Sequence, residues 1–217
     1  MTRHTRRFVD AIACGALLAL SLAGCVSVEV GNEPSAQVLL SLRDASTAAV
    51  ARRNEPLVPA LLVQPQPGSS MAETQLIAYS KRAGEFSFYQ FATWADRPVR
   101  QIPRLLQQRL DARGVAGAVA LAGDPQRADW LLTVAVDTLH HDVGSTPGVA
   151  RLGIALELFD RRARTRVARR EFEAAVPVAR EDSAAAAQAM SSAMSKVFDE
   201  AAPWVEAELQ KAAVATR

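Results

Sequence analysis

Cys25 is the residue whose chemistry is most clearly indicated by its surroundings, because it directly follows Leu22-Ala23-Gly24. Three arginines stand within the first seven residues, and an apolar stretch covers residues 11–20. This order is that of the basic region, the apolar region and the small-residue cleavage site of a bacterial export signal. We therefore expect residues 1–24 to be a cleaved signal peptide. The alternatives are an ordinary signal peptide with an incidental cysteine, and a membrane-spanning helix, which is disfavoured because the uncharged stretch has about 15 residues against roughly 20 needed.

A cysteine at this position resembles the lipobox of bacterial lipoproteins, in which the thiol receives a diacylglycerol and the cysteine becomes the N-terminus after cleavage. The resemblance implies that Cys25 is the lipid attachment site, with palmitate among the acyl chains. Two or more chains hold a protein stably on a membrane, whereas one does not. Val26 stands where an aspartate would be the usual signal for retention in the inner membrane. The resemblance therefore implies an anchor in the outer membrane, facing the periplasm.

The charge of the mature chain gives no reason to expect a nucleic acid as partner. The sequence has 25 Lys and Arg and 23 Asp and Glu, and residues 1–24 hold three Arg and one Asp, so 22 of each sign remain. A formal net charge of zero provides no overall attraction for a polyanion. The two cysteines are Cys14, inside the apolar stretch, and Cys25. We therefore expect a folded domain without disulfides, thiol chemistry or cysteine metal ligands.

The adjacent histidines His140 and His141, followed by Asp142, are the remaining residues that could ligate a metal. Neighbouring residues of a regular strand point to opposite faces, so the pair is poorly suited to hold one ion, and we expect a solvated strand end. The sequence contains no Gly-x-Ser-x-Gly, phosphate-loop or His-Glu-x-x-His pattern. We therefore expect a protein that is not an enzyme and that uses no cofactor or metal.

Six arginines fall within residues 161–170, at a turn between two predicted strands. Guanidinium groups pair bidentately with phosphates, so lipid head groups or an acidic partner are candidate ligands of Arg161, Arg162 and Arg164. The alternative is a solvated turn whose arginines pair with nearby carboxylates such as Glu157.

Apolar periodicity predicts the elements that must position these residues. Alternation over 130–140, 152–158 and 168–176 indicates three strands of an antiparallel meander that is covered on one face. Apolar residues at helical spacing predict two helices, Pro98–Arg113 and Ser183–Ala212, as the cover. The expected fold class is α/β of the α+β type, a two-layer domain with a mostly antiparallel mixed sheet and two main helices packed on one face. Further strands are expected in the earlier apolar runs 37–42, 57–64, 75–80 and 85–94.

Composition divides the chain into four parts. After the signal peptide (1–24) comes a polar, Gly- and Pro-bearing flexible tether (25–36), then a single domain (37–212) and a tail (213–217). A domain of about 180 residues can bury a sufficient core without disulfides.

An aromatic segment and the order of elements carry a family resemblance. The segment Glu85–Pro98 forms an aromatic strand that ends in Trp94 and leads into a helix with Leu105-Leu106. Together with the lipobox, this pattern resembles the ABC-type transport auxiliary lipoprotein family, which is PqiC-like, over about residues 38–204. These are packing motifs, and they identify no catalytic residue.

The resemblance implies an accessory subunit of an intermembrane lipid-transport system, anchored in the outer membrane, which docks the transport conduit there. The implied partners are a protein with MCE domains and an ABC-type or integral membrane transport component, and assembly into a homo-oligomer stays open. The alternative is an assembly or pilot lipoprotein for another envelope complex, which would also be non-enzymatic. Trp94 is either a core residue or an anchor at the partner interface.

Overall fold

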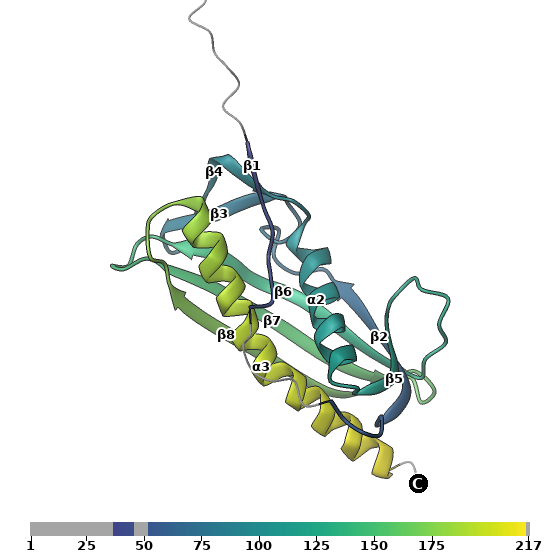
Figure 1. The fold of residues 1–217 in the computed structure, drawn as a ribbon. Helices are drawn as coiled ribbons and strands as arrows, with labels where there is room; N and C mark the ends of the chain where they lie inside the picture. Colours follow the sequence, from purple (N-terminus) through teal and green to yellow (C-terminus); the bar gives the residue numbers. More distant parts are fainter. Residues whose placement is uncertain (1–36, 46–51, 216–217) are drawn as a thin grey trace, which may run out of the picture. The chain divides into compact units, whose positions relative to one another are not determined.

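The computed structural model describes residues 37–45 and 52–215, which belong to the compact unit Gln37–Arg217. The predicted signal peptide and tether, including Cys25, lie outside the described residues. Strands and two long helices make up the described part (Figure 1). In chain order they are β1 (Val38–Leu40), β2 (Val58–Gln66), β3 (Leu76–Arg82), β4 (Glu85–Trp94), α2 (Pro98–Ala112), β5 (Ala116–Leu121), β6 (Trp130–Asp142), β7 (Val149–Asp160), β8 (Thr165–Pro177) and α3 (Ser183–Ala215).

Strand β6 is the branch point of a mixed sheet. Along one edge it pairs antiparallel with β7, which pairs antiparallel with β8, and this confirms the predicted meander. Along its other edge β6 pairs in parallel with β2 through residues 130–135 and with β3 through residues 141–142. β5 extends the sheet beyond β2, and β4 followed by β1 extends it beyond β3. The sheet therefore carries β2 and β5 at one end and β1, β3 and β4 at the other.

Helices α2 and α3 cover one face of this sheet (Figure 1). α2 begins at Pro98, a residue favoured in the first turn because its fixed φ suits a helix and it has no amide hydrogen to leave unpaired. Pro103 and Pro203 lie inside α2 and α3, and both helices continue past them. Apolar side chains of both helices join those of the sheet in one core cluster. The two-layer α+β fold expected from the sequence is confirmed.

The opposite face of β7 and β8 is polar, as their alternation predicts. The antiparallel register sets Glu157 beside Arg169, whose Nε lies 3.3 Å from Glu157 Oε1 and whose Nη2 donates to Glu171 Oε1 at 2.7 Å. Arg166 Nη1 donates to Glu157 Oε1 at 2.9 Å. Exposed ion pairs contribute little stability each. Their charges nevertheless protect the 13-residue outer strand β8 from pairing with another chain.

Candidate functional site

Residues 41–45, which follow β1, are held by side chains of both helices. The Leu42 amide donates to Gln101 Oε1 at 3.3 Å, and Gln101 Nε2 donates back to the Leu42 carbonyl at 3.1 Å. Ser191 and Ser195 of α3 accept hydrogen bonds through their Oγ atoms, from the Arg43 amide at 3.2 Å and from the Ala45 amide at 2.7 Å respectively. These side chains thus form hydrogen bonds with backbone N–H and C=O groups that lie outside any strand or helix. The segment through which the chain enters the domain is therefore fixed to α2 and α3.

A cluster of Arg109, Asp44 and Asp199, the Arg109 cluster, fixes the same segment through charge. The Arg109 side chain is 5% exposed; its Nε donates to Asp44 Oδ2 at 2.7 Å, and its Nη2 donates to the other oxygen of that carboxylate. Nη1 donates to Asp199 Oδ1 of α3 at 2.6 Å. Burial alone would lower the pKa of Arg109, but the two carboxylates raise that pKa above its ordinary value. A single buried cation therefore joins the entering segment, α2 and α3.

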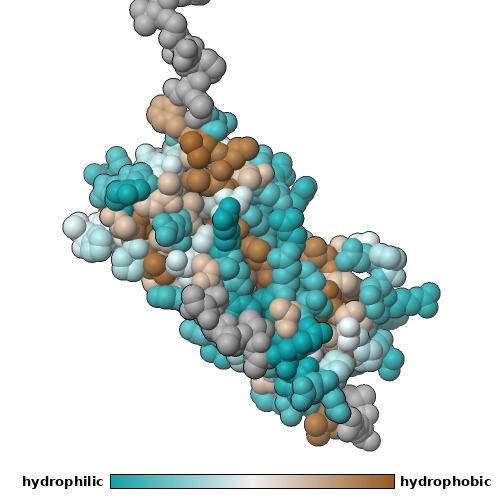
Figure 2. Space-filling model, viewed as in Figure 1, coloured by the Kyte–Doolittle hydropathy of each residue, from teal (hydrophilic) through white to brown (hydrophobic). Residues whose placement is uncertain are grey.

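The end of the sheet where the chain enters carries exposed apolar side chains. The register places Leu39 of β1 beside Thr93 of β4, and Thr93 lies opposite Leu76 of β3. Leu39 is 64% exposed, Phe91 61%, Val38 51% and Leu76 39%. We call Leu39, Leu76 and Phe91 the N-terminal apolar patch; Val38, the strand neighbour of Leu39, points to the opposite face of β1. Figure 2 shows hydrophobic residues gathered at this end. Clustered apolar exposure of this kind marks a surface for contact.

Next to the patch, side chains of β3 and β4 line a hollow of about 360 Å³. The Tyr79 and Tyr89 rings lie 5.2 Å apart, and Tyr89 Oη lies 2.7 Å from Nδ1 of His141. Burial, followed by the negative charges of Asp182 and Glu181, raises the pKa of Tyr89 to about 12, so this phenol stays protonated at neutral pH. The lining residues are Tyr79, Lys81, Phe88, Tyr89, Gln90, Phe91, Val143 and Glu181.

His141 corrects the expectation of a solvated strand end, because its side chain is fully buried. Its Nε2 faces Gly148, where an added Cβ would lie 2.5 Å away, and this nitrogen has no hydrogen-bond partner among the described residues. His140 packs edge-on against the Phe86 ring at 5.2 Å. Burial lowers the pKa of both histidines. The pair is therefore part of the packing at the end of β6.

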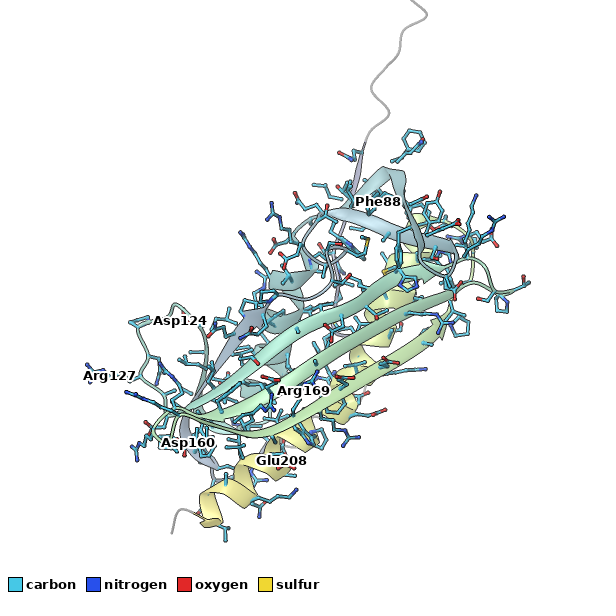
Figure 3. The ribbon with its side chains drawn as sticks, turned by 180° about the vertical axis from the view of Figure 1, so that it is seen from behind. Phe88, Asp124, Arg127, Asp160, Arg169 and Glu208 are labelled. Atoms are coloured by element: carbon cyan, nitrogen blue, oxygen red, sulfur yellow. The ribbon has the colours of Figure 1, made fainter. Side chains whose placement is uncertain are left out.

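The arginine turn, residues 161–164, joins β7 and β8 at the opposite end of the meander. Asp160 pairs with Trp130 at the start of β6, and Figure 3 shows Phe88 of β4 and Asp160 at opposite ends. Asp160 Oδ1 accepts hydrogen bonds from the amides of residues 162 and 163 at 2.8 and 3.0 Å. Arg164 takes a left-handed conformation with φ 56°. The turn therefore lies a full strand length from the N-terminal apolar patch.

The three candidate arginines of this turn are exposed but differ in their contacts. Arg161 Nη1 donates to the Ala128 carbonyl at 2.8 Å, and Arg162 Nη2 lies 2.8 Å from Asp129 Oδ2. Among the described residues, the Arg164 guanidinium has no ion-pair partner. Two arginines thus attach the turn to the 122–129 loop, beside a hollow of about 600 Å³, and Arg164 is left facing solvent.

Trp94, the other candidate, is 1% exposed and belongs to the core cluster. This placement fits the core interpretation, and a contact with a partner would require the indole to be uncovered. The buried polar residues Gln101 and Arg109 are not among the candidate residues predicted from the sequence. A signal was present, because Arg109 continues the helical spacing of Ile102 and Leu106 and so falls on the apolar stripe of α2.

Residues 37–45 and 52–215 contain neither a metal-binding cluster nor a membrane-spanning helix. No group of three or more His, Cys, Asp or Glu side chains there is arranged to hold a metal ion. In the same ranges, no helix combines the length and the apolar character needed to cross a membrane.

The described residues thus form an α+β domain with exposed apolar side chains at one end of its sheet and an arginine turn at the other. The sequence matches the family of ABC-type transport auxiliary lipoprotein components over residues 40–202, and the chain belongs to that family. This membership confirms the resemblance inferred from the sequence.

Solved structures agree with this fold. A crystal structure of a Xanthomonas campestris protein described as a member of DUF330 is 24% identical, with 80% of this chain and 97% of that chain covered and a TM-score of 0.70. A second crystal structure, of an uncharacterized protein, is 13% identical, with 77% and 99% covered and a TM-score of 0.57. No curated protein matches the sequence significantly.

Proposed function

We propose that this protein is a lipid-anchored accessory subunit of an intermembrane lipid-transport system, attached through Cys25 to the periplasmic side of the outer membrane. Its partners are an MCE-domain protein and an ABC-type or integral inner-membrane transport component. The observation that carries the proposal is membership of the transport auxiliary lipoprotein family over residues 40–202, which includes nearly the whole described domain. The role is to dock the transport conduit at the membrane and involves no reaction.

Two features of the chain support this role. The lipobox-like sequence before Cys25 supplies a position at the membrane. The arginine turn supplies a contact for an acidic protein surface, since Arg164 is exposed and its guanidinium can form bidentate hydrogen bonds with a carboxylate. Because Arg161 and Arg162 attach the turn to the 122–129 loop, they hold Arg164 in position.

Affinity purification of the full-length protein from membranes, in mild detergent, tests the proposal. We expect an MCE-domain protein among the recovered partners, and a diacylglycerol-modified N-terminal Cys25 by mass spectrometry. Recovery of a secretin or a lipopolysaccharide-export component in place of an MCE protein would establish the pilot alternative and refute the proposal.

The arginine turn is tested in the same purification. Replacing Arg161, Arg162 and Arg164 by alanine should lower recovery of the partner at least fivefold. The matched control replaces three exposed arginines, Arg97 at the N-cap of α2 and Arg100 and Arg104 inside that helix, and removes the same charge at another place. Equal recovery from both triple variants at low salt would show that the turn makes no partner contact.

A further inference from the structure

We propose that the N-terminal apolar patch (Leu39, Leu76 and Phe91) lies in the head-group interface of the membrane that holds the Cys25 anchor. The inference rests on the proposed lipid attachment. It adds a property that the anchor does not supply, namely the orientation of the domain relative to the bilayer.

The length of chain between anchor and patch favours a lipid occupant. Twelve residue steps separate Cys25 from Gln37, which directly precedes the patch. A chain of that length spans at most about 43 Å. The 12-residue strand β7 is about 40 Å long, and the arginine turn lies at its far end. The patch is therefore the exposed apolar surface held closest to the lipid, whereas the arginine turn reaches the membrane only if the domain turns over.

The chemistry of the patch and its surroundings suits a bilayer interface. Aliphatic and phenyl groups such as Leu39 and Phe91 enter the boundary between head groups and acyl chains, where their burial is favourable. The adjoining hollow is lined by Tyr79 and Lys81, whose apolar bodies and polar tips match that boundary, together with Phe88 and Glu181. The outer face of β7 and β8, by contrast, carries ion pairs that would lose their water in the same position.

The patch cannot move relative to the rest of the domain, because the segment that follows β1 is bound to both helices. Residues 41–45 are bound to α2 and α3 through Gln101 and Arg109, so Val38 and Leu39 cannot move independently of the domain. Insertion of the patch therefore orients the whole sheet. In this orientation the arginine turn points away from the anchoring membrane, so Arg164 meets an acidic protein partner and not the head groups of that bilayer.

Fluorescence quenching on vesicles tests the orientation. The chain from Val26 contains the whole compact unit and no cysteine. An N-terminal histidine tag holds it on nickel-chelating lipid in vesicles of phosphatidylethanolamine and phosphatidylglycerol, which makes the test independent of natural acylation. An environment-sensitive dye is attached to Gln90→Cys, beside the patch, or to Ala163→Cys, in the arginine turn. We expect lipids spin-labelled in the head-group region to quench the dye at residue 90 at least threefold more than the dye at residue 163.

The patch variant Leu39→Ser/Leu76→Ser/Phe91→Ser should abolish this difference. Its control, Val167→Ser/Val214→Ser, changes apolar residues that are 40% and 69% exposed elsewhere, and should preserve it. Equal quenching at both sites, or stronger quenching at residue 163, would overturn the proposal. The proposal would also fail if the protein with the unaltered patch gave no quenching at residue 90 while the patch variant lost the transport partner, because the patch would then bind protein. A missing lipid on native Cys25 would instead contradict the proposed function.

Discussion

The replacement Arg109→Met measures how firmly the entering segment is bound to the two helices. Methionine keeps an unbranched apolar stem but removes three charge-assisted hydrogen bonds, each of which contributes about 1.5–3 kcal/mol. The side chains of Asp44 and Asp199 are 21% and 43% exposed, so both carboxylates recover part of their hydration. Breaking one side of a buried ion pair costs about 3–5 kcal/mol, and the partial exposure places the expected loss at about 3 kcal/mol.

Urea unfolding of the chain from Val26 checks this magnitude. A loss of about 3 kcal/mol also lowers Tm by about 6–12 °C for a domain of this size. We expect Asp44→Asn to cost about 1–2 kcal/mol and Asp199→Asn less than about 1 kcal/mol, because Asp199 is the more exposed partner. The control Arg104→Met, at an exposed position of the same helix, should stay within about 0.5 kcal/mol. A loss below about 1 kcal/mol for Arg109→Met, or a larger effect at Asp199 than at Asp44, would refute the role of the Arg109 cluster in binding the entering segment.

Three further predictions concern packing. Burial lowers the pKa of His140 and His141, so below about pH 6.5 the unfolded chain binds more protons than the folded one. The free energy of unfolding therefore falls as the pH drops, by at most about 1.4 kcal/mol per pH unit for each histidine. His141→Gln should flatten this dependence in urea titrations between pH 7.5 and 5. Gly148→Ala sets a Cβ 2.5 Å from the His141 ring and should cost about 1–3 kcal/mol by thermal unfolding, and unchanged stability would exclude that contact. Trp94→Ala should cost about 3–5 kcal/mol, and a well-folded variant that lost only partner recovery would instead favour the interface interpretation.

The sequence predicts the elements whose signal is local. The meander follows from the alternation of apolar and polar residues in parts of β6, β7 and β8, although the pairing is interrupted by a register shift after Val136 and another after Leu158. The start of α2 follows from Pro98, and its buried stripe from Ile102, Leu106 and Leu110. Polar Arg and Glu between apolar residues likewise predict the charged outer face of the sheet.

What the sequence does not predict depends on contacts between distant segments. The parallel pairing of β6 with both β2 and β3 leaves no mark in the apolar pattern of either strand. The burial of His141 depends on Gly148 and Tyr89, each on a different strand or loop. Arg109 is charged like its exposed neighbours, and only the carboxylates that arrive from residues 44 and 199 explain why it lies inside.

The pairing of the sheet fixes the distance between the N-terminal apolar patch and the arginine turn. The proposed lipid at Cys25 would limit the height of the domain above the membrane only to a maximum, because twelve residue steps span at most about 43 Å. The strand β6 is paired along both edges, with β3 near the patch and β2 near the arginine turn, and such pairing cannot slip without turning its core face to water. The two ends are therefore separated by a fixed span of about 40 Å. With the patch in the bilayer interface, that span becomes the height at which Arg164 is presented, so insertion of the patch would turn a loose attachment into a defined docking position.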